Sequence, residues 1–318
     1  MKVSLLEPIG VEKSKIDDLS KKLIEGGHSF TYYESKTTDV EELKHRSEGQ
    51  DIVMIANNPY PNEVIESLDS LKMLNVAFTG IDHVGLSACK EKGITVCNCS
   101  GYSNVSVSEL VIGMTINALR FVNTCDNAVR NGKTSMGLTG TEIKDKTVGI
   151  IGCGQIGFMT ARLFQAFGAK VIATARHERE EVKKTGIEYV DLDTLLSTSD
   201  IVSLHVPANA DTKGMISAEK IALMKPTAVF INCARGPIVD NEALANALNE
   251  GRIAAAAIDV FDMEPPIPED YPLLHAKNTI LTPHVAFLTK EAMIRRAEIL
   301  FENVYAYVEG TPIHTCEL

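Results

Sequence analysis

The middle of the chain alternates between short apolar runs and an apolar stripe with helical spacing. Residues 148–151 form an apolar run bounded by glycine, which is typical of a strand buried on both faces. An amphipathic helix is predicted next, with a stripe through Ile156, Met159, Leu163 and Phe167. Gly168 stands at the helix stop, and a second apolar run follows at residues 171–175. The stretch therefore predicts a strand, a helix and a strand within about 30 residues.

The same alternation continues on both sides of this unit. Before it, strands are predicted at residues 3–6, 30–33, 52–56, 73–78 and 94–97, with a helical stripe through Ile16, Leu19, Leu23 and Ile24 and a short helix at 64–71. After it, strands are predicted at 201–206, 228–233, 255–260 and 279–282, with helices at 192–196, 218–224 and 241–248. Strands separated by helices imply right-handed crossovers and parallel sheets.

The predicted fold class is therefore α/β, with two doubly wound parallel-sheet domains. We expect a flavodoxin-like domain from residues 1–100 and 289–318, because the amphipathic helix at 290–308 should return to the first domain. A Rossmann dinucleotide-binding domain over residues 101–288 would be inserted into it. The helix predicted at 109–122 is apolar nearly all round, so we expect it between domains or at a subunit contact. Residues 130–146 are polar and predict an exposed crossing loop.

Three glycines between the first strand and the helix of the central unit form G-x-G-x-x-G. Gly152 permits a tight turn, Gly154 lets a pyrophosphate approach the backbone, and Gly157 lets the helix pack close to the strand. The N–H groups of Gln155 and Ile156, at the positive end of the helix dipole, predict an anion seat. A glycine-rich turn without a ligand is the alternative, and the strand–turn–helix–strand context favours a dinucleotide site.

Composition narrows the classes of partner. The 318 residues suggest about two domains, and the net charge of −11 argues against nucleic acid as a partner. The first ten residues carry too short an apolar part for a signal peptide, and no run approaches a membrane span. The seven scattered cysteines predict buried apolar residues in a reducing cytoplasm. Cys97 and Cys99 would face opposite sides of a strand, so no metal site is expected.

Ionisable residues follow several of the predicted strands in the second domain. Ligands of doubly wound sheets bind beyond the carboxyl ends of the strands. Arg235, Glu264 and His284 each lie shortly after an apolar run. Taken singly, a surface guanidinium, a loop carboxylate and a capping histidine would explain them. Their joint position at the ends of successive strands of one sheet favours a functional group of residues.

The sequence resembles the D-isomer-specific 2-hydroxyacid dehydrogenases, the family of D-lactate, glyoxylate/hydroxypyruvate and phosphoglycerate dehydrogenases. The motifs that carry the resemblance are TVGIIGCGQIG, LHVPANADTKGMI, INCARGPIVDNEAL, AAIDVFDMEP and LTPHVAF. The similarity runs from about residue 53 to residue 312 and is strongest over residues 146–286. It implies a cytoplasmic, homodimeric oxidoreductase that uses a nicotinamide cofactor on a small 2-oxo acid or D-2-hydroxy acid.

The resemblance also implies roles for individual residues. His284 would be the acid/base, oriented by Glu264, and Arg235 would bind the substrate carboxylate and carbonyl. Asp259 matches the aspartate that binds the cofactor carboxamide. Further substrate contacts are implied for Asn57, Thr79, Gly80 and Tyr102. Further cofactor contacts are implied for Ala175, Arg176, His177, His205, Val206, Pro207, Thr212, Cys233, Ala234, Arg235, His284 and Ala286.

Two departures from the family pattern bear on the substrate. Related phosphoglycerate dehydrogenases place a basic residue after the third strand, where this chain has Asn57, Asn58, Pro59 and Tyr60. A phosphorylated substrate is therefore disfavoured, and phosphoglycerate dehydrogenase is an alternative only. Phe287 stands where glycine or tryptophan is more usual. A second alternative is a dinucleotide-sensing scaffold that resembles the corepressors of the C-terminal-binding-protein type, which the absence of a long tail after the last helix disfavours.

The end of the second strand of the dinucleotide unit predicts the cofactor. An NAD-preferring site usually has an acid there, about 20 residues after the glycines, to bond the ribose 2′-hydroxyl. This chain has Ala175, followed by Arg176 and His177, which could bind a 2′-phosphate. NADP(H) is therefore favoured and NAD(H) remains possible. In the alternative, Glu178 turns inward to replace the lost acid.

Overall fold

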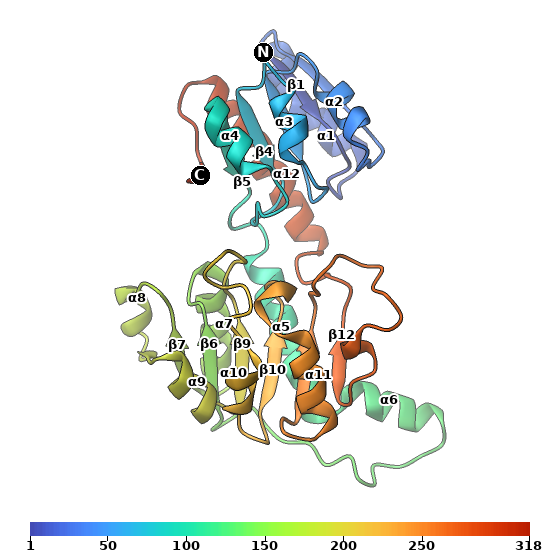
Figure 1. Cartoon of the computed structure of the whole chain (residues 1–318), viewed down its shortest axis with the longest axis vertical. Helices are drawn as coiled ribbons and strands as arrows, with labels where there is room; N and C mark the ends of the chain where they lie inside the picture. Colours follow the sequence, from blue (N-terminus) through green and yellow to red (C-terminus); the bar gives the residue numbers. More distant parts are fainter. The chain divides into compact units, whose positions relative to one another are not determined.

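The computed structural model describes residues 1–318, and the chain forms two compact units. Unit 1 comprises Met1–Ser103 and Leu288–Leu318, and unit 2 comprises Asn104–Phe287. Each unit has its own sheet, and every strand pair in both sheets is parallel (Figure 1). The predicted fold class, two doubly wound parallel-sheet α/β domains, is confirmed.

Unit 1 has a five-stranded sheet in the order β2-β1-β3-β4-β5. This is the flavodoxin-like order, in which the chain reverses direction across the sheet between β1 and β3. All residues of β3 and β4 are buried, including the polar Asn75 of β4, as is typical of strands covered on both faces. The strands are β1 (Lys2–Leu5), β2 (Ser29–Tyr32), β3 (Ile52–Ile55), β4 (Met73–Val76) and β5 (Thr95–Asn98).

Five helices cover this sheet, and the last of them comes from the end of the chain. The helices are α1 (Lys13–Glu25), α2 (Val40–Ser47), α3 (Asn62–Glu66), α4 (Leu86–Lys92) and α12 (Lys290–Val308). Helix α12 packs on α1 and β4, and the side-chain amide of Asn75 in β4 donates to the Leu300 carbonyl at 2.7 Å. One residue of the apolar stripe predicted for α1 is misplaced. Ile24 is exposed, and the buried face of the helix runs through Ile16, Ser20 and Leu23.

Unit 2 has a seven-stranded sheet in the order β12-β11-β10-β9-β6-β7-β8. Its first strand, β6, lies inside the sheet, and the chain winds outward from it in both directions, as in a Rossmann fold. The strands are β6 (Thr147–Ile151), β7 (Lys170–Thr174), β8 (Glu188–Tyr189), β9 (Ile201–Leu204), β10 (Val229–Asn232), β11 (Ala255–Ile258) and β12 (Thr279–Leu281). The helices are α5 (Asn104–Arg120), α6 (Val122–Arg130), α7 (Gln155–Ala166), α8 (Glu180–Lys183), α9 (Leu192–Thr198), α10 (Ala218–Ala222) and α11 (Asn241–Asn249), with short 3₁₀ turns at Gly236–Ile238 and Pro272–Leu274.

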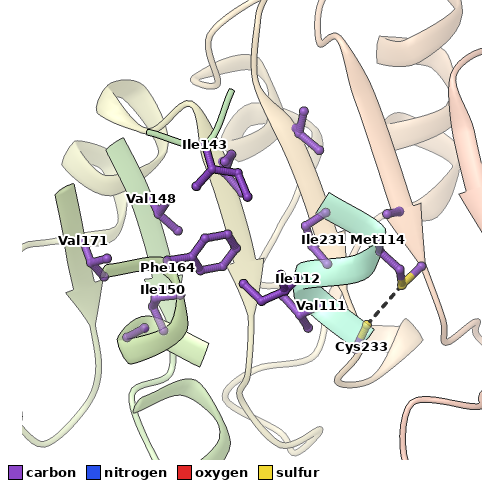
Figure 2. Packing of buried hydrophobic residues seen from close by; sticks show 14 of the residues in the cluster. Val111, Ile112, Met114, Ile143, Val148, Ile150, Phe164, Val171, Ile231 and Cys233 are labelled. Atoms are coloured by element: carbon purple, nitrogen blue, oxygen red, sulfur yellow. Dashed lines mark hydrogen bonds between the residues drawn. The ribbon is translucent and has the colours of Figure 1, made fainter. Parts of the chain in front are cut away.

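The apolar helix that sequence placed between domains or at a subunit contact packs into the core of unit 2. Val111 and Ile112 of α5 lie beside Phe164 of α7, which in turn faces Val148 of β6 (Figure 2). At the other end of this cluster the Met114 sulfur contacts the Cys233 thiol at 3.6 Å. The helix is apolar on so many sides because α7 and strands β10, β11 and β12 all contact it.

Two local predictions in unit 2 are corrected. The buried face of α7 runs through Gly157, Thr160, Ala161 and Phe164, one position away from the predicted stripe, and Phe167 is exposed because the helix ends at Ala166. The second correction concerns the segment after α5, where Phe121 adopts a left-handed φ of 55° and starts an additional helix, α6. Residues 131–146 contain no helix or strand, as the polar stretch predicts. No single helix is long and apolar enough to cross a membrane, and α5 and α6 pass that test only as a pair bent by 57°.

The turn between β6 and α7 shows why each glycine stands where it does. Gly152 has a φ of 91°, and a Cβ there would lie 2.6 Å from a methyl carbon of Val206. A Cβ on Gly157 would lie 2.0 Å from the Gly152 carbonyl oxygen. A Cβ on Gly154 would meet nothing within 4 Å. The first and third glycines are therefore required by the fold itself, whereas the second is open to whatever approaches the turn.

Phe164→Ala should destabilise unit 2 by roughly 3–5 kcal/mol, because the fully buried ring fills the space between α5 and β6. Phe167→Ala, three residues further on, is the matched control. Its ring is 45% exposed, so its loss should cost less than about 0.5 kcal/mol. Urea unfolding of both variants measures the difference, and similar midpoints would contradict this packing.

Gly157→Ala should lower the melting temperature, because the new methyl group must displace the backbone of the turn. Gly154→Ala should leave the melting temperature nearly unchanged, because the same methyl group enters open space. Thermal unfolding followed by circular dichroism compares the two. An equal loss of stability in both variants would contradict the close contact between Gly157 and the Gly152 carbonyl.

Candidate active site

The functional residues of unit 2 gather at one edge of its sheet. Because all seven strands are parallel, their carboxyl ends lie on the same side. The glycine turn follows β6, Ala175 follows β7, and His205 follows β9. Arg235 follows β10, Asp259 follows β11, and His284 follows β12. The residues predicted to bind the dinucleotide and those predicted to be catalytic thus follow successive strands along this one edge.

A cavity of about 460 Å³ opens at the β6, β7 and β9 part of this edge. It brings together nine of the predicted cofactor residues: Gly152, Gly154, Ala175, Arg176, His177, His205, Val206, Pro207 and Thr212. Gln155, Ile156 and Gly157 do not line it; they form the first turn of α7, whose N-terminus begins beside Gly154. A helix N-terminus, an open glycine and an adjoining cavity together fit the pyrophosphate and one ribose of a dinucleotide.

Two arginines and one histidine line this cavity near the end of β7. Arg176 and His177 were predicted, and the Arg176 guanidinium faces the Asp211 carboxylate at 3.8 Å across exposed surface. Arg179 was not predicted. Its guanidinium donates to the Cys153 carbonyl at 3.3 Å and pairs with Glu181, so it lies against the glycine turn. Glu178, the alternative acid, pairs with Lys183 at 2.7 Å and does not line the cavity.

His205 forms part of the inner wall. Its ring Nε2 lies 2.8 Å from the Ser203 hydroxyl, and burial lowers the pKa of the imidazole to about 4. The ring is therefore neutral at neutral pH and contributes shape and a hydrogen bond, not charge. Thr212, in the loop facing it, donates its hydroxyl to the Pro207 carbonyl at 2.6 Å, which keeps the segment after β9 in place.

At the β12 end of the edge, Glu264 and His284 form a close pair. The His284 Nδ1 lies 2.9 Å and 3.0 Å from the two carboxylate oxygens of Glu264. A carboxylate can only accept, so Nδ1 carries the proton and Nε2 is the nitrogen that Glu264 does not contact. The His284 backbone is left-handed, with φ 55°, and the Phe287 ring meets the imidazole edge-on at 5.2 Å.

Asp259 holds the turn on which His284 stands. Its buried carboxylate accepts from the Thr282 hydroxyl at 2.5 Å and from the backbone N–H groups of Val285 and Ala286, each at 2.9 Å. Burial raises the pKa of Asp259, and these three donors together with His284 act in the opposite direction. The structure thus gives this aspartate, and with it Ala286, an anchoring role that the sequence did not suggest.

Arg235 leads a loop that touches the Glu264 loop through backbone. A Cβ on the next residue, Gly236, would lie 1.9 Å from the Phe261 carbonyl oxygen, so only glycine fits there. The Asn241 side-chain amide donates to the Gly236 carbonyl at 3.2 Å and to the Asp262 carboxylate at 2.9 Å. The other Asp262 oxygen accepts from the Tyr271 hydroxyl at 2.7 Å.

Sequence reasoning missed this Asp262 network. No motif joins Asn241, Asp262 and Tyr271, and only the folded chain brings them together. Cys233 is also placed differently from the prediction: its side chain points into the core against Met114, so it can face the edge only through its backbone. Ala234 donates its N–H to the Asn232 side chain and lies half-buried beside Arg235.

The predicted substrate residues Asn57, Thr79, Gly80 and Tyr102 belong to unit 1. Asn57 follows β3 and accepts from the Lys36 ammonium at 3.1 Å. Thr79 follows β4, and its buried hydroxyl oxygen has no hydrogen-bond partner. Tyr102 is 1% exposed, and the Arg296 guanidinium lies over its ring at 5.7 Å. Burial raises the pKa of the Tyr102 hydroxyl to about 12, so it remains a neutral, packed side chain.

Neither unit contains a cluster of three or more His, Cys, Asp or Glu side chains suited to a metal ion.

Residues 112–286 match the family described as D-isomer specific 2-hydroxyacid dehydrogenase, NAD binding domain. The chain is 35% identical over 305 residues to the hydroxypyruvate reductase of Blautia hydrogenotrophica, covering 93% of this chain and 94% of that protein. Its fold is similar to an acyclic imino acid reductase in complex with NADPH and D-Arg, with TM-score 0.91, 31% identity and full coverage of both chains.

It is also similar to the D-lactate dehydrogenase of Aquifex aeolicus complexed with NAD and lactic acid, with TM-score 0.84 and 29% identity over 98% of this chain and 96% of that one. A family match over more than half of the chain, near full-length relatives and the dinucleotide cavity at the sheet edge agree with one another. The chain therefore belongs to the D-isomer-specific 2-hydroxyacid dehydrogenases, oxidoreductases that work with a nicotinamide dinucleotide.

Proposed function

We propose that the protein reduces a small, non-phosphorylated 2-oxo acid of the size of glyoxylate, hydroxypyruvate or pyruvate, with NADPH as the preferred reductant. The observation that carries the proposal is the His284–Glu264 pair, which shares a sheet edge with Arg235 and the dinucleotide cavity. A positioned imidazole, a guanidinium and a nucleotide seat are the groups that carbonyl reduction of a 2-oxo acid requires.

His284 supplies the proton. Glu264 holds Nδ1, so Nε2 is the nitrogen that donates to the ketone oxygen as carbon 2 is reduced. A reduced nicotinamide dinucleotide, which the glycine turn and the residues of the cavity would hold, would supply the hydride for carbon 2. The carboxylate of Glu264 keeps the imidazole oriented before and after the transfer. The C=O bond becomes C–H and O–H, and His284 ends neutral.

Arg235 binds the substrate. A planar guanidinium can hold a carboxylate and the adjacent carbonyl oxygen together, which fixes carbon 2 for attack. The backbone of Gly236, next to Arg235, packs against the backbone of Phe261 and Asp262. This contact limits how far the loop that carries Arg235 can move relative to the loop that carries Glu264. In unit 1, we assign the backbone N–H groups of Thr79 and Gly80 to the substrate carboxylate, because the resemblance implies a substrate contact there.

The cofactor preference rests on the outer end of the cavity. Ala175 offers no carboxylate to the ribose 2′-hydroxyl, and Arg176 and Arg179 present guanidinium groups there, with the His177 ring beside them. Asp211 faces Arg176 and would repel a 2′-phosphate, which makes Arg179, held against the glycine turn, the more firmly placed donor. Among the residues that line the cavity, two guanidinium groups accompany one carboxylate, and this favours NADP(H) over NAD(H).

A second candidate function is a dinucleotide-binding scaffold without turnover, because such proteins keep similar site residues. Loss of reduced-nicotinamide absorbance with a panel of 2-oxo acids separates the two. Turnover of glyoxylate, hydroxypyruvate, pyruvate or a branched 2-oxo acid is expected. No turnover of any of them would favour the scaffold.

His284→Gln should lower kcat by about 10²–10⁴-fold, because it removes the proton donor and leaves the cavity intact. Cofactor affinity, measured by fluorescence titration, should change little. An unchanged kcat would end the assignment of His284.

Glu264→Gln should have a milder effect, because the imidazole remains. The glutamine oxygen can still accept from Nδ1, so kcat should fall less than in His284→Gln. A loss of kcat as large as that of His284→Gln would contradict a positioning role for Glu264.

The kcat/KM for NADPH should exceed that for NADH with one good substrate. Arg179→Ala and Arg176→Ala should each lower the NADPH value about tenfold, whereas Ala175→Asp combined with Arg176→Ala should reverse the preference. Arg162→Ala, on an exposed face of α7, is the matched control. A wild-type preference for NADH would refute the assignment.

The protein should be a homodimer that associates through the segment from Phe121 to Met136. Helix α6 buries no residue and stands clear of the other elements of unit 2 (Figure 1), and Val129 and Met136 are 74% and 90% exposed. Sedimentation at micromolar concentration should give twice 34.6 kDa, and Val129→Glu should shift the protein towards monomer. Leu223→Glu, at an exposed site elsewhere on unit 2, should not. A wild-type species of 34.6 kDa would contradict the prediction.

A further inference from the structure

One carboxylate in unit 2 links the two loops that carry Arg235 and Glu264. Asp262 lies two residues before Glu264, in the segment that follows β11. One of its carboxylate oxygens accepts from the Asn241 side-chain amide at 2.9 Å, and the other accepts from the Tyr271 hydroxyl at 2.7 Å. Asn241 and Tyr271 are only 4% and 7% exposed. Two buried donors therefore fix a carboxylate that itself lies at the surface.

Asn241 extends this link to the loop of Arg235. The same side-chain amide that donates to Asp262 also donates to the Gly236 carbonyl at 3.2 Å. Gly236 follows Arg235 directly, and a Cβ on it would lie 1.9 Å from the Phe261 carbonyl oxygen. The amide therefore bonds both loops at the point where their backbones touch.

The orientation of the Asn241 side chain serves these two bonds. Its amide nitrogen has two acceptors, whereas its buried oxygen has no hydrogen-bond partner in the chain. Turning the amide over would place the oxygen against the Gly236 carbonyl and the Asp262 carboxylate, which are both acceptors. A buried acceptor without a donor is destabilising, and proteins accept such costs mainly at functional sites.

Both donors belong to one packed block of unit 2. Asn241 is the first residue of α11, and Tyr271 directly precedes the 3₁₀ turn Pro272–Leu274, which packs on α11. The Tyr271 ring also meets the Phe261 ring edge-on at 5.7 Å. The Glu264 loop is therefore docked, through Asp262, on the block that also holds the loop of Arg235.

We propose that Asp262 is a positioning residue that sets the placement of the Glu264 carboxylate relative to the Arg235 guanidinium. The proposal rests on the proposed function, in which Arg235 binds the substrate and Glu264 orients His284. In this role Asp262 contacts neither substrate nor cofactor and acts only through the two loops. Placement matters because a displacement of about 1 Å can lower a rate about 100-fold.

The test measures kcat and KM for one good 2-oxo acid, together with NADPH affinity and melting temperature. Asp262→Ala removes both bonds, so KM should rise and kcat should fall, and kcat/KM should drop about 10-fold or more. NADPH affinity should change little, because Asp262 does not line the dinucleotide cavity. Asp270→Ala, which removes an exposed acid of the same segment, should leave kcat and KM unchanged.

Two milder variants separate the bonds from the charge. In Asp262→Asn, the new side-chain oxygen can accept from Asn241 and the new amide can donate to the Tyr271 hydroxyl oxygen. This variant should therefore retain most of the wild-type kcat/KM. Tyr271→Phe keeps the ring against Phe261 and loses one bond, so its kcat/KM should lie between those of Asp262→Ala and the wild type.

A second comparison asks whether the effect on kcat passes through Glu264. A Glu264→Ala background has no carboxylate left to position, so adding Asp262→Ala should lower kcat little further while it still raises KM. A merely structural role of Asp262 would instead lower kcat by the same factor in both backgrounds.

The outcomes separate this proposal from the proposed function. Turnover by the wild type with kcat and KM that Asp262→Ala leaves unchanged would overturn the positioning role alone. An equal loss of kcat in both backgrounds, or a loss in Asp262→Asn as large as in Asp262→Ala, would also overturn it. If Asp262→Ala does not fold, unchanged kcat and KM in Tyr271→Phe would overturn it. Absence of wild-type turnover with every 2-oxo acid would overturn the proposed function, and the positioning role with it.

Discussion

At the end of β11, the buried carboxylate of Asp259 accepts hydrogen bonds from the Thr282 hydroxyl and from the backbone N–H groups of Val285 and Ala286. These bonds join the last two strands of the sheet beyond the point where their pairing ends. They hold the turn that carries His284, whose own N–H donates to the Asp259 carbonyl at 2.8 Å. The imidazole is therefore placed by the sheet itself. Glu264 contacts an imidazole whose position is already fixed by the backbone of this turn.

Periodicity predicted most of the fold because most of its strands are buried on both faces. Largely apolar runs such as those of β6 and β9 leave little ambiguity about their structure. The errors fall where tertiary packing decides. The buried face of α7 includes Gly157 and Thr160, which hydropathy does not distinguish from surface residues. The break at Phe121 and the helix after it follow from a single left-handed residue, which no pattern in the sequence indicates.

The candidate site divides in the same way. Residues that belong to one contiguous motif, such as the glycine turn, could be located from the sequence because their function fixes their spacing. Arg179, Asp262 and Lys36 could not, because each acts on a partner from another segment of the chain. Lys36 reaches Asn57 across 21 positions and Asp262 meets Asn241 across the same number. Such contacts between distant segments can be seen only in the folded chain. The sequence of residues 57–60 therefore suggested a loop without a cation, whereas in the structure the Lys36 ammonium contacts Asn57.

The left-handed backbone at His284 has a consequence for how this protein can change. A residue with a side chain held at φ 55° costs about 1–3 kcal/mol relative to relaxed backbone, and glycine or asparagine would reduce that cost. Random substitution at this position therefore offers variants that fold more stably while losing the imidazole. Stability and chemistry oppose each other at this one residue. Selection for thermal resistance alone would favour loss of the imidazole, whereas selection for the proposed proton transfer would retain it.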